Sequence, residues 1–366
     1  MSPRLLLVLT LTVATFSFAD DGKGHHPTLT PQTSGTTQLL IAVSPVNSRV
    51  VWASGTGGTY VVTTDGGNTW KAAVIPGAET LQFRSVHGVS DKVAYLMSIG
   101  NNTTDFRIYK TIDGGKHWTI EFTNQLAGAF YDCFGFWTPR RAIAHSDSVN
   151  GVFPELRTEN GRTWQSIAAN MPPALPGEAS FAASNTCVAT EGDENAWVAT
   201  GAQSIAARVL ATRDGGDSWN AYDTPLVTSP SAGAISVAFR DAWHGIVGGG
   251  DLASNSSADA ATSDDGGQTW TLTSPPPVQG SIFCLAYVQG KHHDDEGEGD
   301  HALERAVVIT AETAPDFASG SAAWTPDEGR TWHTLPNVSG YWAVGFANPR
   351  AGWFVGNNGQ ILKISF

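Results

Sequence analysis

Charged residues are scarce in this sequence. They make up 15% of the 366 residues, whereas 10% are aromatic. A coiled coil or a solvated acidic tail needs more charge, and a disordered chain has fewer aromatic rings. Basic residues are outnumbered, because 21 Lys and Arg stand against 34 Asp and Glu and give a formal charge of −13. This balance repels phosphate backbones, so nucleic acid is not expected as a partner.

Long apolar runs are absent beyond the first twenty residues. Arg4 precedes an apolar run from Leu5 to Phe18, and Ala19 ends a stretch of the kind that a signal peptidase reads. We predict a signal peptide at residues 1–19 and a secreted or periplasmic mature chain at 20–366; an uncleaved anchor is the alternative. No later segment approaches eighteen consecutive apolar residues, which predicts no membrane span in the mature chain.

Familiar catalytic motifs are also missing. The chain has no G-x-S-x-G elbow, phosphate loop, C-x-x-C pair or H-E-x-x-H segment. No amphipathic helix of three turns is evident after residue 20. The absence of these motifs favours a binding protein over an enzyme, and we expect no cofactor.

An eight-residue box recurs six times, beginning with Thr63-Thr-Asp65-Gly-Gly67-Asn-Thr69-Trp70. In five copies a hydroxyl residue opens the box, Asp is third, Gly fifth and Trp eighth. The copy at residues 157–164 is degenerate: Glu replaces Asp and the opening hydroxyl is missing. The acidic and aromatic members are Asp65 and Trp70, Asp113 and Trp118, Glu159 and Trp164, Asp214 and Trp219, Asp265 and Trp270, and Asp327 and Trp332.

The chemistry of the box is that of a tight turn. Gly permits a positive φ, and the carboxylate can accept backbone N–H bonds across the loop. The Trp leads into an apolar strand, where a large ring fills the gap to a neighbouring sheet. We predict structural roles for these acids, because nothing in the box requires a substrate.

The spacing of the boxes predicts a repeated unit of three strands, the box and a fourth strand. Seven first strands can be aligned for six boxes, at residues 40–43, 84–87, 132–135, 186–189, 236–239, 283–286 and 343–346. The last unit stops at Ile364 before any fourth strand, and Pro27–Thr30 is placed to supply it. We predict an all-β, seven-bladed β-propeller, closed by its N- and C-terminal strands, as a single domain.

The repeated boxes, together with Gly352-Trp-Phe-Val-Gly356 and Gly359-Gln-Ile361, resemble the Asp-box (BNR-type) repeat of β-propellers. Nearly all of the mature chain is similar to the photosystem II stability/assembly factor family. The resemblance implies an exported scaffold that presents a face or central channel to a protein or cell-envelope partner. Family members acting on photosystem II bind a reaction-centre subunit through an Arg-rich patch, and cyanobacterial members carry a lipid on a Cys after the signal peptide. Here the arginines are dispersed, and residue 20 is Asp.

Four residues on the aligned first strands are candidates for a polar binding site in the channel: Arg84, His87, Tyr131 and Asp132. The alternative is that they are solvated channel residues that pair locally. We expect the chain to be a monomer.

An enzyme remains the alternative function. Sialidases share the box, and Phe106-Arg107-Ile108-Tyr109 loosely resembles their first arginine motif, but it lacks the Pro and lies on a middle strand. A sialidase-like or other glycan-active hydrolase would use Asp132 or Tyr131.

Two further features leave alternatives open. The insert His292–His301 is rich in His and acids, but its spacing fits no defined metal loop, so we predict no metal site. Cys133, Cys187 and Cys284 align at one position of the first strands. They either pack as thiols between blades, or Cys133 and Cys187 form a bridge between adjacent blades.

Overall fold

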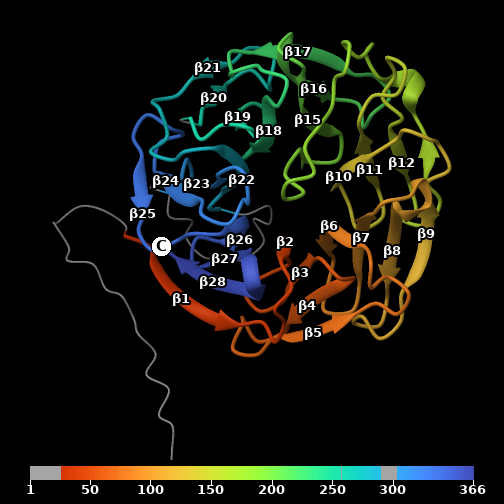
Figure 1. The fold of residues 1–366 in the computed structure, drawn as a ribbon, viewed down its shortest axis with the longest axis vertical. Coiled ribbons are helices and arrows are strands. Elements are labelled where there is room, and N and C mark those ends of the chain that lie inside the picture. The colour runs from red at the N-terminus through yellow and green to blue at the C-terminus, as the bar shows by residue number, and fades with distance from the viewer. Residues whose placement is uncertain (1–25, 257, 290–302) are drawn as a thin grey trace, which may run out of the picture.

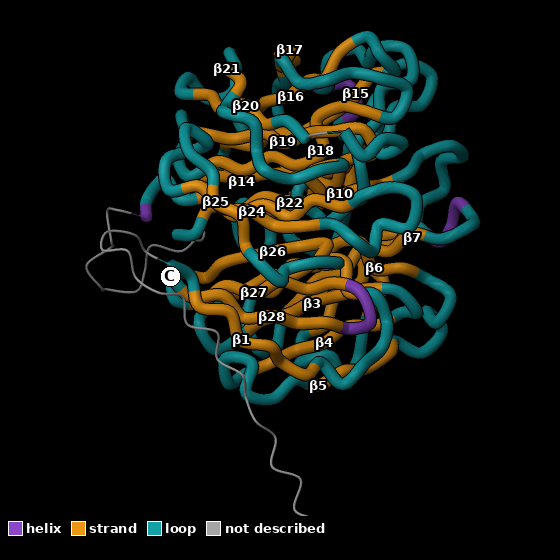
Figure 2. The backbone as a smooth tube through the Cα atoms, turned by 60° about the vertical axis from the view of Figure 1, so that its left-hand side comes forward, coloured by secondary structure: helices purple, strands orange, loops and turns teal. Residues whose placement is uncertain are grey.

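Short antiparallel strands make up nearly all of the regular structure in this computed structural model, which describes residues 26–256, 258–289 and 303–366. Figure 1 shows small sheets arranged radially around a central axis, and Figure 2 shows the strands stacked across the ring. The chain is an all-β propeller. Among the described residues, no helix is long and apolar enough to cross a membrane.

The strands occupy four positions from the axis to the rim (Figure 1). The first strands are β2 (Leu40–Pro45), β6 (Gln82–Gly88), β10 (Tyr131–Phe136), β14 (Val188–Glu191), β18 (Ala232–Phe239), β22 (Ser281–Tyr287) and β26 (Tyr341–Asn348). The second strands are β3 (Val51–Gly55), β7 (Ala94–Ile99), β11 (Ala142–Ser146), β15 (Asn195–Ala202), β19 (Gly245–Asp251), β23 (Val307–Glu312) and β27 (Ala351–Gly356).

The third and fourth strands complete the sheets toward the rim. The third strands are β4 (Thr59–Thr63), β8 (Arg107–Thr111), β12 (Leu156–Thr158), β16 (Ala206–Thr212), β20 (Ala260–Ser263), β24 (Ser321–Thr325) and β28 (Gln360–Ser365). The outermost strands are β5 (Lys71–Val74), β9 (Thr119–Thr123), β13 (Gln165–Ser166), β17 (Asn220–Thr224), β21 (Thr271–Leu272), β25 (His333–Leu335) and β1 (Thr28–Thr33).

The pairing differs in one place from the separate four-stranded sheets expected from the sequence. Five sheets have four strands each, whereas β18–β25 form a single eight-stranded sheet. The join is one residue pair, Gly250 of β19 with Ser281 of β22. Gly250 has φ of 140° and no side chain, so the backbone of Ser281 can approach it closely.

The two ends of the chain meet in one sheet, as the sequence predicts. β1 pairs with β28 in antiparallel register from Thr28 with Ser365 to Thr33 with Gln360. The N-terminal strand thereby covers the edge that the C-terminal strand would leave open. The first strands contact their neighbours in chain order, and β26 contacts β2, so the ring is closed.

Large rings fill the layers between sheets. Trp52, Trp197 and Trp353 are fully buried on second strands, and each belongs to a different apolar cluster. Because the side chains of a strand alternate between its two faces, each sheet contributes to the layers on both sides.

The alternation of strand direction gives the ring two distinct faces. The turns between first and second strands lie on the same face as the boxes, and we call this the box face. The connections between successive sheets lie on the opposite face.

Candidate functional site

A pocket of about 190 Å³ lies among the first strands. It is lined by their carboxyl-terminal halves, which point to the box face, and by Asn185 and Thr186. Rings contribute to the lining at His87, Phe136, Phe239, Tyr287 and Phe346.

The pocket is closed on the other side by residues 179–187, which we call the plug. The plug ends the long connection between β13 and β14 and contains buried Ala183 and Ser184. Ala183 packs in a cluster with Ile41, Phe283 and Trp342 of three different sheets. The plug therefore lies across the axis between first strands that are far apart in the sequence.

Hydrogen bonds connect the plug to several sheets. They run from Arg84 Nη1 to the Ala182 carbonyl oxygen (2.8 Å), Phe134 N to Asn185 Oδ1 (3.2 Å), Ser184 Oγ to the Phe283 carbonyl oxygen (2.5 Å) and Val237 N to the Thr186 carbonyl oxygen (2.8 Å). The Thr186 and Ser236 hydroxyls share a further bond of 2.7 Å. The start of the plug is held by two backbone bonds between Ala179 and Gly201 and by Ser180 Oγ, which donates to the Ala199 carbonyl oxygen at 2.7 Å.

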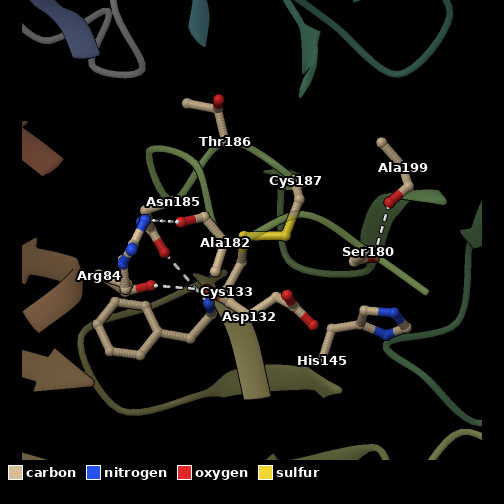
Figure 3. The surroundings of a disulfide bond; sticks show 12 residues. Arg84, Asp132, Cys133, His145, Ser180, Ala182, Asn185, Thr186, Cys187 and Ala199 are labelled. Carbon is tan, nitrogen blue, oxygen red and sulfur yellow. Dashed lines mark hydrogen bonds between the residues drawn. A yellow bond between two sulfur atoms is a disulfide. The ribbon is translucent and has the colours of Figure 1, made fainter. Parts of the chain in front are cut away.

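A disulfide joins Cys133 of β10 to Cys187 at the end of the plug (Figure 3). The two Cα atoms lie 6.0 Å apart, which is within disulfide reach. The bridge that the sequence left open is therefore formed between adjacent sheets. Cys284 is a buried free thiol, and burial raises its pKa.

The four predicted channel residues lie in different surroundings. His87 lines the pocket and stacks on Phe136, with ring centroids 4.1 Å apart. Tyr131 is buried, and its hydroxyl donates to the Pro154 carbonyl oxygen at 2.9 Å. Burial also raises the Tyr131 pKa.

Arg84 and Asp132 are close in space but not hydrogen-bonded to each other. Figure 3 shows the Asp132 carboxyl group on the side of His145, away from the Arg84 guanidinium. Arg84 donates to Gln82 and Ala182 and lies 5.4 Å from the Trp342 ring centroid. Burial lowers the pKa of Arg84 to about 10, and the nearby charge of Asp132 opposes this shift.

Buried Asp132 and half-buried Asp147 are neighbouring acids, and each shifts the pKa of the other. Asp132 is only 1% exposed, and burial raises its pKa well above the ordinary range, as does the charge of Asp147. Burial raises the Asp147 pKa too, and the Ser180 N–H, which Asp147 Oδ1 accepts at 2.9 Å, opposes that rise.

A second buried pair lies beside the first. His145 Nδ1 and Glu155 Oε2 are 2.7 Å apart, and both side chains are fully buried. Burial raises the Glu155 pKa, and His145 opposes the rise. Three atoms of these residues, Asp132 Oδ2, His145 Nε2 and Glu155 Oε1, are buried without a hydrogen-bond partner among the described residues. No cluster of three metal-ligating side chains occurs in the described ranges, and the insert at 292–301 lies outside them.

Five of the box turns share one hydrogen-bond pattern. In the first, Asp65 Oδ1 accepts from Thr63 Oγ1 (2.8 Å) and the Thr69 backbone N–H (2.9 Å), while Oδ2 accepts from Thr69 Oγ1 (2.7 Å). Thr63 Oγ1 in turn accepts the Gly67 N–H at 2.9 Å. The carboxylates of Asp113, Asp214, Asp265 and Asp327 hold their turns in the same way.

The degenerate turn corrects the alignment of Glu159. Asn160 Oδ1, not Glu159, accepts the N–H groups of Arg162 and Thr163, each at 2.8 Å. The opening hydroxyl is present as Thr158, which accepts the Gly161 N–H at 2.9 Å. The turn is one residue shorter than the others, so the register shifts and Glu159 points outward. It pairs with Arg141 and Arg157.

A basic groove of about 590 Å³ lies on the box face between the sheets of β6–β9 and β10–β13. Lys110, Arg140 and Arg162 line it together with Tyr95 and Ile112. No carboxylate of the described residues lies within 4.0 Å of these three cations. Burial lowers the Lys110 pKa, the nearby charge of Glu121 on β9 opposes this shift, and Arg162 and Arg140 lower the pKa further.

Sequence reasoning missed Asp147, the plug and the groove. The plug had a visible signal, because residues 167–187 are a long stretch without strand pattern inside a regular repeat. The groove had none, since its cations come from three separate turns and strands.

Comparisons with known proteins locate the chain by its fold. No family model and no curated protein sequence matches it. The solved structure "YCF48 bound to D1 peptide" is 15% identical, with a TM-score of 0.64 over 97% of this chain and 100% of that one. "YCF48 from Cyanidioschyzon merolae" is 17% identical, with a TM-score of 0.62 over 92% and 98%. The WD40 propeller domain of Doa1 is 12% identical, with a TM-score of 0.53 over 92% and 96%. At these identities the likeness shows a β-propeller fold.

Proposed function

We propose that this chain is an exported, non-catalytic, seven-bladed propeller of the Asp-box type, and that it binds an acidic segment of a protein partner on its box face. The mature domain would be residues 20–366, secreted or periplasmic. The observation that carries the proposal is the basic groove.

The groove is electrostatically unfavourable as it stands. Three cations repel one another, and Lys110, held over the Tyr95 ring at 4.9 Å, is partly desolvated. The chain as a whole has a formal charge of −13, with 34 acidic residues against 21 basic ones. On the neighbouring strand β12, Arg157 is paired with Glu159 and Asp217. Glu121 is close enough to affect Lys110 and Arg162, but it makes no ion pair with them in the described part of the chain, so the groove is suited to an anionic ligand.

An apolar side chain stands at the edge of the same groove. Ile112 is 69% exposed, more than any other large hydrophobic residue in the described part of the chain. Apolar contact beside a charge cluster is typical of peptide-binding surfaces, where burial gives affinity and charge gives orientation. The favoured ligand is therefore a segment with two or three carboxylates next to an apolar side chain.

Two other considerations support the wider proposal. One similar solved structure is titled as YCF48 bound to a peptide, and peptide binding by a related fold is the function proposed here. The count of seven blades is supported by the closed ring of first strands and by the single residue pair that fuses β18–β21 with β22–β25.

Binding to an array of synthetic peptides that vary in acidic and apolar content tests the proposal. We expect wild-type protein to select acidic peptides that contain a large apolar residue, with affinity falling as salt rises. The double variant Arg140→Glu, Arg162→Glu should bind these peptides roughly tenfold more weakly or worse.

The matched control is Arg49→Glu, Arg350→Glu, which makes the same charge change at two exposed positions on box-face turns of other sheets. It should retain wild-type affinity for the selected peptides. Equal losses in the two double variants would show a nonspecific charge effect, and no selection of acidic peptides by wild type would contradict the proposal.

A further inference from the structure

The pocket among the first strands, which we call the axial pocket, has room for a single ring. Its volume is about 190 Å³, whereas sites for whole small molecules usually enclose about 300 Å³ or more. An engineered apolar cavity of about 150 Å³ binds benzene. The axial pocket therefore suits one side chain of a larger ligand, and the remainder of that ligand must lie outside it.

The rings that line the axial pocket are held in fixed positions by their neighbours. Phe239 stacks on Trp197 with ring centroids 3.6 Å apart, and Phe136 stacks on His87 at 4.1 Å. Four of the five lining rings are buried: Phe136, Phe239, Tyr287 and Phe346. Such a preformed lining favours an aromatic side chain, because rings gain from edge-to-face and offset contacts and little ordering is needed on binding.

A ligand can enter the axial pocket from one face of the ring. The plug closes the other end with Asn185 and Thr186, which line the pocket. Thr186 is fixed by the bond that its hydroxyl shares with Ser236, and Asn185 by the bond that it accepts from the Phe134 N–H. A side chain must therefore enter from the box face, on which the basic groove also lies.

The axial pocket and the basic groove are next to each other on that face, where β6 and β10 are neighbours (Figure 1). Gly88, the last residue of β6, lines the pocket, and the next residue, Val89, lines the groove. Phe136 at the end of β10 lines the pocket, and its ring centroid lies 4.7 Å from that of Tyr95, which lines the groove. A single extended segment, at about 3.3 Å per residue, can therefore place residues in both.

We propose that the axial pocket receives an aromatic side chain, Phe or Tyr, of the same acidic segment that binds the basic groove. This inference rests on the proposed function and extends it, because it assigns a second contact and a direction to the bound segment. The carboxylates lie over Lys110, Arg140 and Arg162, and the segment then crosses the turns after β6 and β10 toward the axis. Charge orients the segment, and burial of the ring supplies affinity.

Binding of peptides of constant charge to wild-type protein tests this inference. Each peptide carries the same acidic stretch and has Phe, Tyr, Leu or Ala at one position, which is moved along the peptide from one set to the next. We expect one position at which Phe and Tyr peptides bind roughly tenfold or more tightly than the Ala peptide, with Leu between them. Fluorescence anisotropy with a dye at the acidic end measures the affinities.

Filling the axial pocket should remove this preference. Ala238 of β18 and Ala286 of β22 line the pocket, are partly exposed and belong to a sheet that does not line the groove. In Ala238→Leu and in Ala286→Leu the added atoms occupy the space of the ring, so Phe peptides should bind no better than Ala peptides. The affinity of the Ala peptides should stay at the wild-type value, since the groove is unchanged. If one variant does not fold, the other carries the test.

Ala127→Leu is the matched control, because Ala127 is exposed on the connection between β9 and β10, on the face opposite the boxes. It should keep the wild-type preference for Phe and Tyr. Acidic peptides that bind wild type equally well with and without an aromatic residue would overturn this inference alone, as would a preference that survives in the filled variants. Absence of binding by every acidic peptide would overturn the proposed function as well.

Discussion

The Tyr60 hydroxyl donates a hydrogen bond of 2.6 Å to the carbonyl oxygen of Gly115, and so ties the third strand of one sheet to the box turn of the next. The other five box turns also accept a side-chain bond from the preceding blade, from a third strand in three cases, from the second strand β15 in one, and from Ser274, just after β21, in one. The pairs are Lys363 with Gly66, Lys110 with Gly161, Arg157 with Gly215, Trp197 with Gly266, and Ser274 with Arg330. The boxes therefore join neighbouring sheets as well as closing their own turns.

Removing this contact at Tyr60 should weaken the fold by a limited amount. In Tyr60→Phe the ring keeps its edge contact with Trp118, 5.2 Å between centroids, but the Gly115 carbonyl oxygen loses its donor. We expect the free energy of unfolding to fall by about 1 kcal/mol. Urea denaturation followed by tryptophan fluorescence measures it.

Tyr222→Phe is the control for that experiment. Tyr222 is a partly buried tyrosine packed against an apolar cluster, and its hydroxyl has no hydrogen bond to any described residue. Its substitution should leave the urea midpoint near wild type. A loss in Tyr60→Phe no larger than in Tyr222→Phe would show that the link between the sheets contributes nothing.

Acid should loosen the box turns in a predictable range. Hydrogen bonds from the Thr69 hydroxyl and backbone N–H, and then from Thr63, lower the pKa of Asp65 to about 2. A lowered pKa contributes stability above the ordinary carboxyl pKa, and this contribution is lost as pH falls from about 4 to about 2. Asp65→Asn should therefore lose less thermal stability than wild type over this range, although it is less stable at neutral pH.

Calorimetry at several pH values would check this expectation, with Asp91→Asn as control. Asp91 carries an exposed carboxylate that pairs with the adjacent Lys92. Parallel acid curves for wild type and Asp65→Asn would mean that the Asp65 carboxylate does not hold the turn.

The repeat predicts the fold well because each box and each strand is a local signal. The turn residues, the period-two strands and the unmatched strand at the N-terminus are all readable from neighbouring residues. The join between β19 and β22 was not predictable, because it depends on how closely Gly250 and Ser281 approach across two sheets. Glu159 was misplaced for a related reason: a one-residue deletion is visible only when the acceptor of each N–H is known.

The candidate site was harder to predict because it depends on how the sheets pack. Alignment placed Arg84 and Asp132 on first strands, and the structure brings them near each other. It could not show that a segment from between β13 and β14 would fill the axis and separate them from the pocket. Equally, Lys110, Arg140 and Arg162 look dispersed along the chain, and only the packing of two sheets gathers them.

Alkaline pH should weaken the fold through Glu312. Burial raises the pKa of Glu312 to about 8, the Gly320 N–H opposes the rise, and Asp316 adds to it. In the folded protein this group is protonated below about pH 8, whereas in the unfolded chain it ionises near its ordinary value. Its contribution is present below the unfolded pKa and is lost as pH rises through about 8.

The variant Glu312→Gln should flatten the fall in unfolding free energy between about pH 5 and about pH 8, which amounts to at most a few kcal/mol. Urea midpoints across this range measure it. Retention of the full wild-type slope in Glu312→Gln would assign the pH dependence to the other buried acids, Asp132 first among them.

The disulfide should contribute more to stability than any of these single contacts. Cys133 and Cys187 are 54 residues apart in the sequence, and in the chain-entropy account a closed loop of that length restricts the unfolded chain by about 4 kcal/mol. Cys133→Ala, Cys187→Ala should therefore lower the free energy of unfolding by a comparable amount. The stability of reduced wild type should approach that of the double variant, because both then lack the cross-link.

Cys284→Ala is the control, since Cys284 is buried but unbridged. Any stability lost in Cys284→Ala comes from packing and from the bond to Val344. That loss must be the same with and without a dithiol reductant. A double variant as stable as oxidised wild type would mean that the folded structure, not the bridge, holds β10 and the plug together.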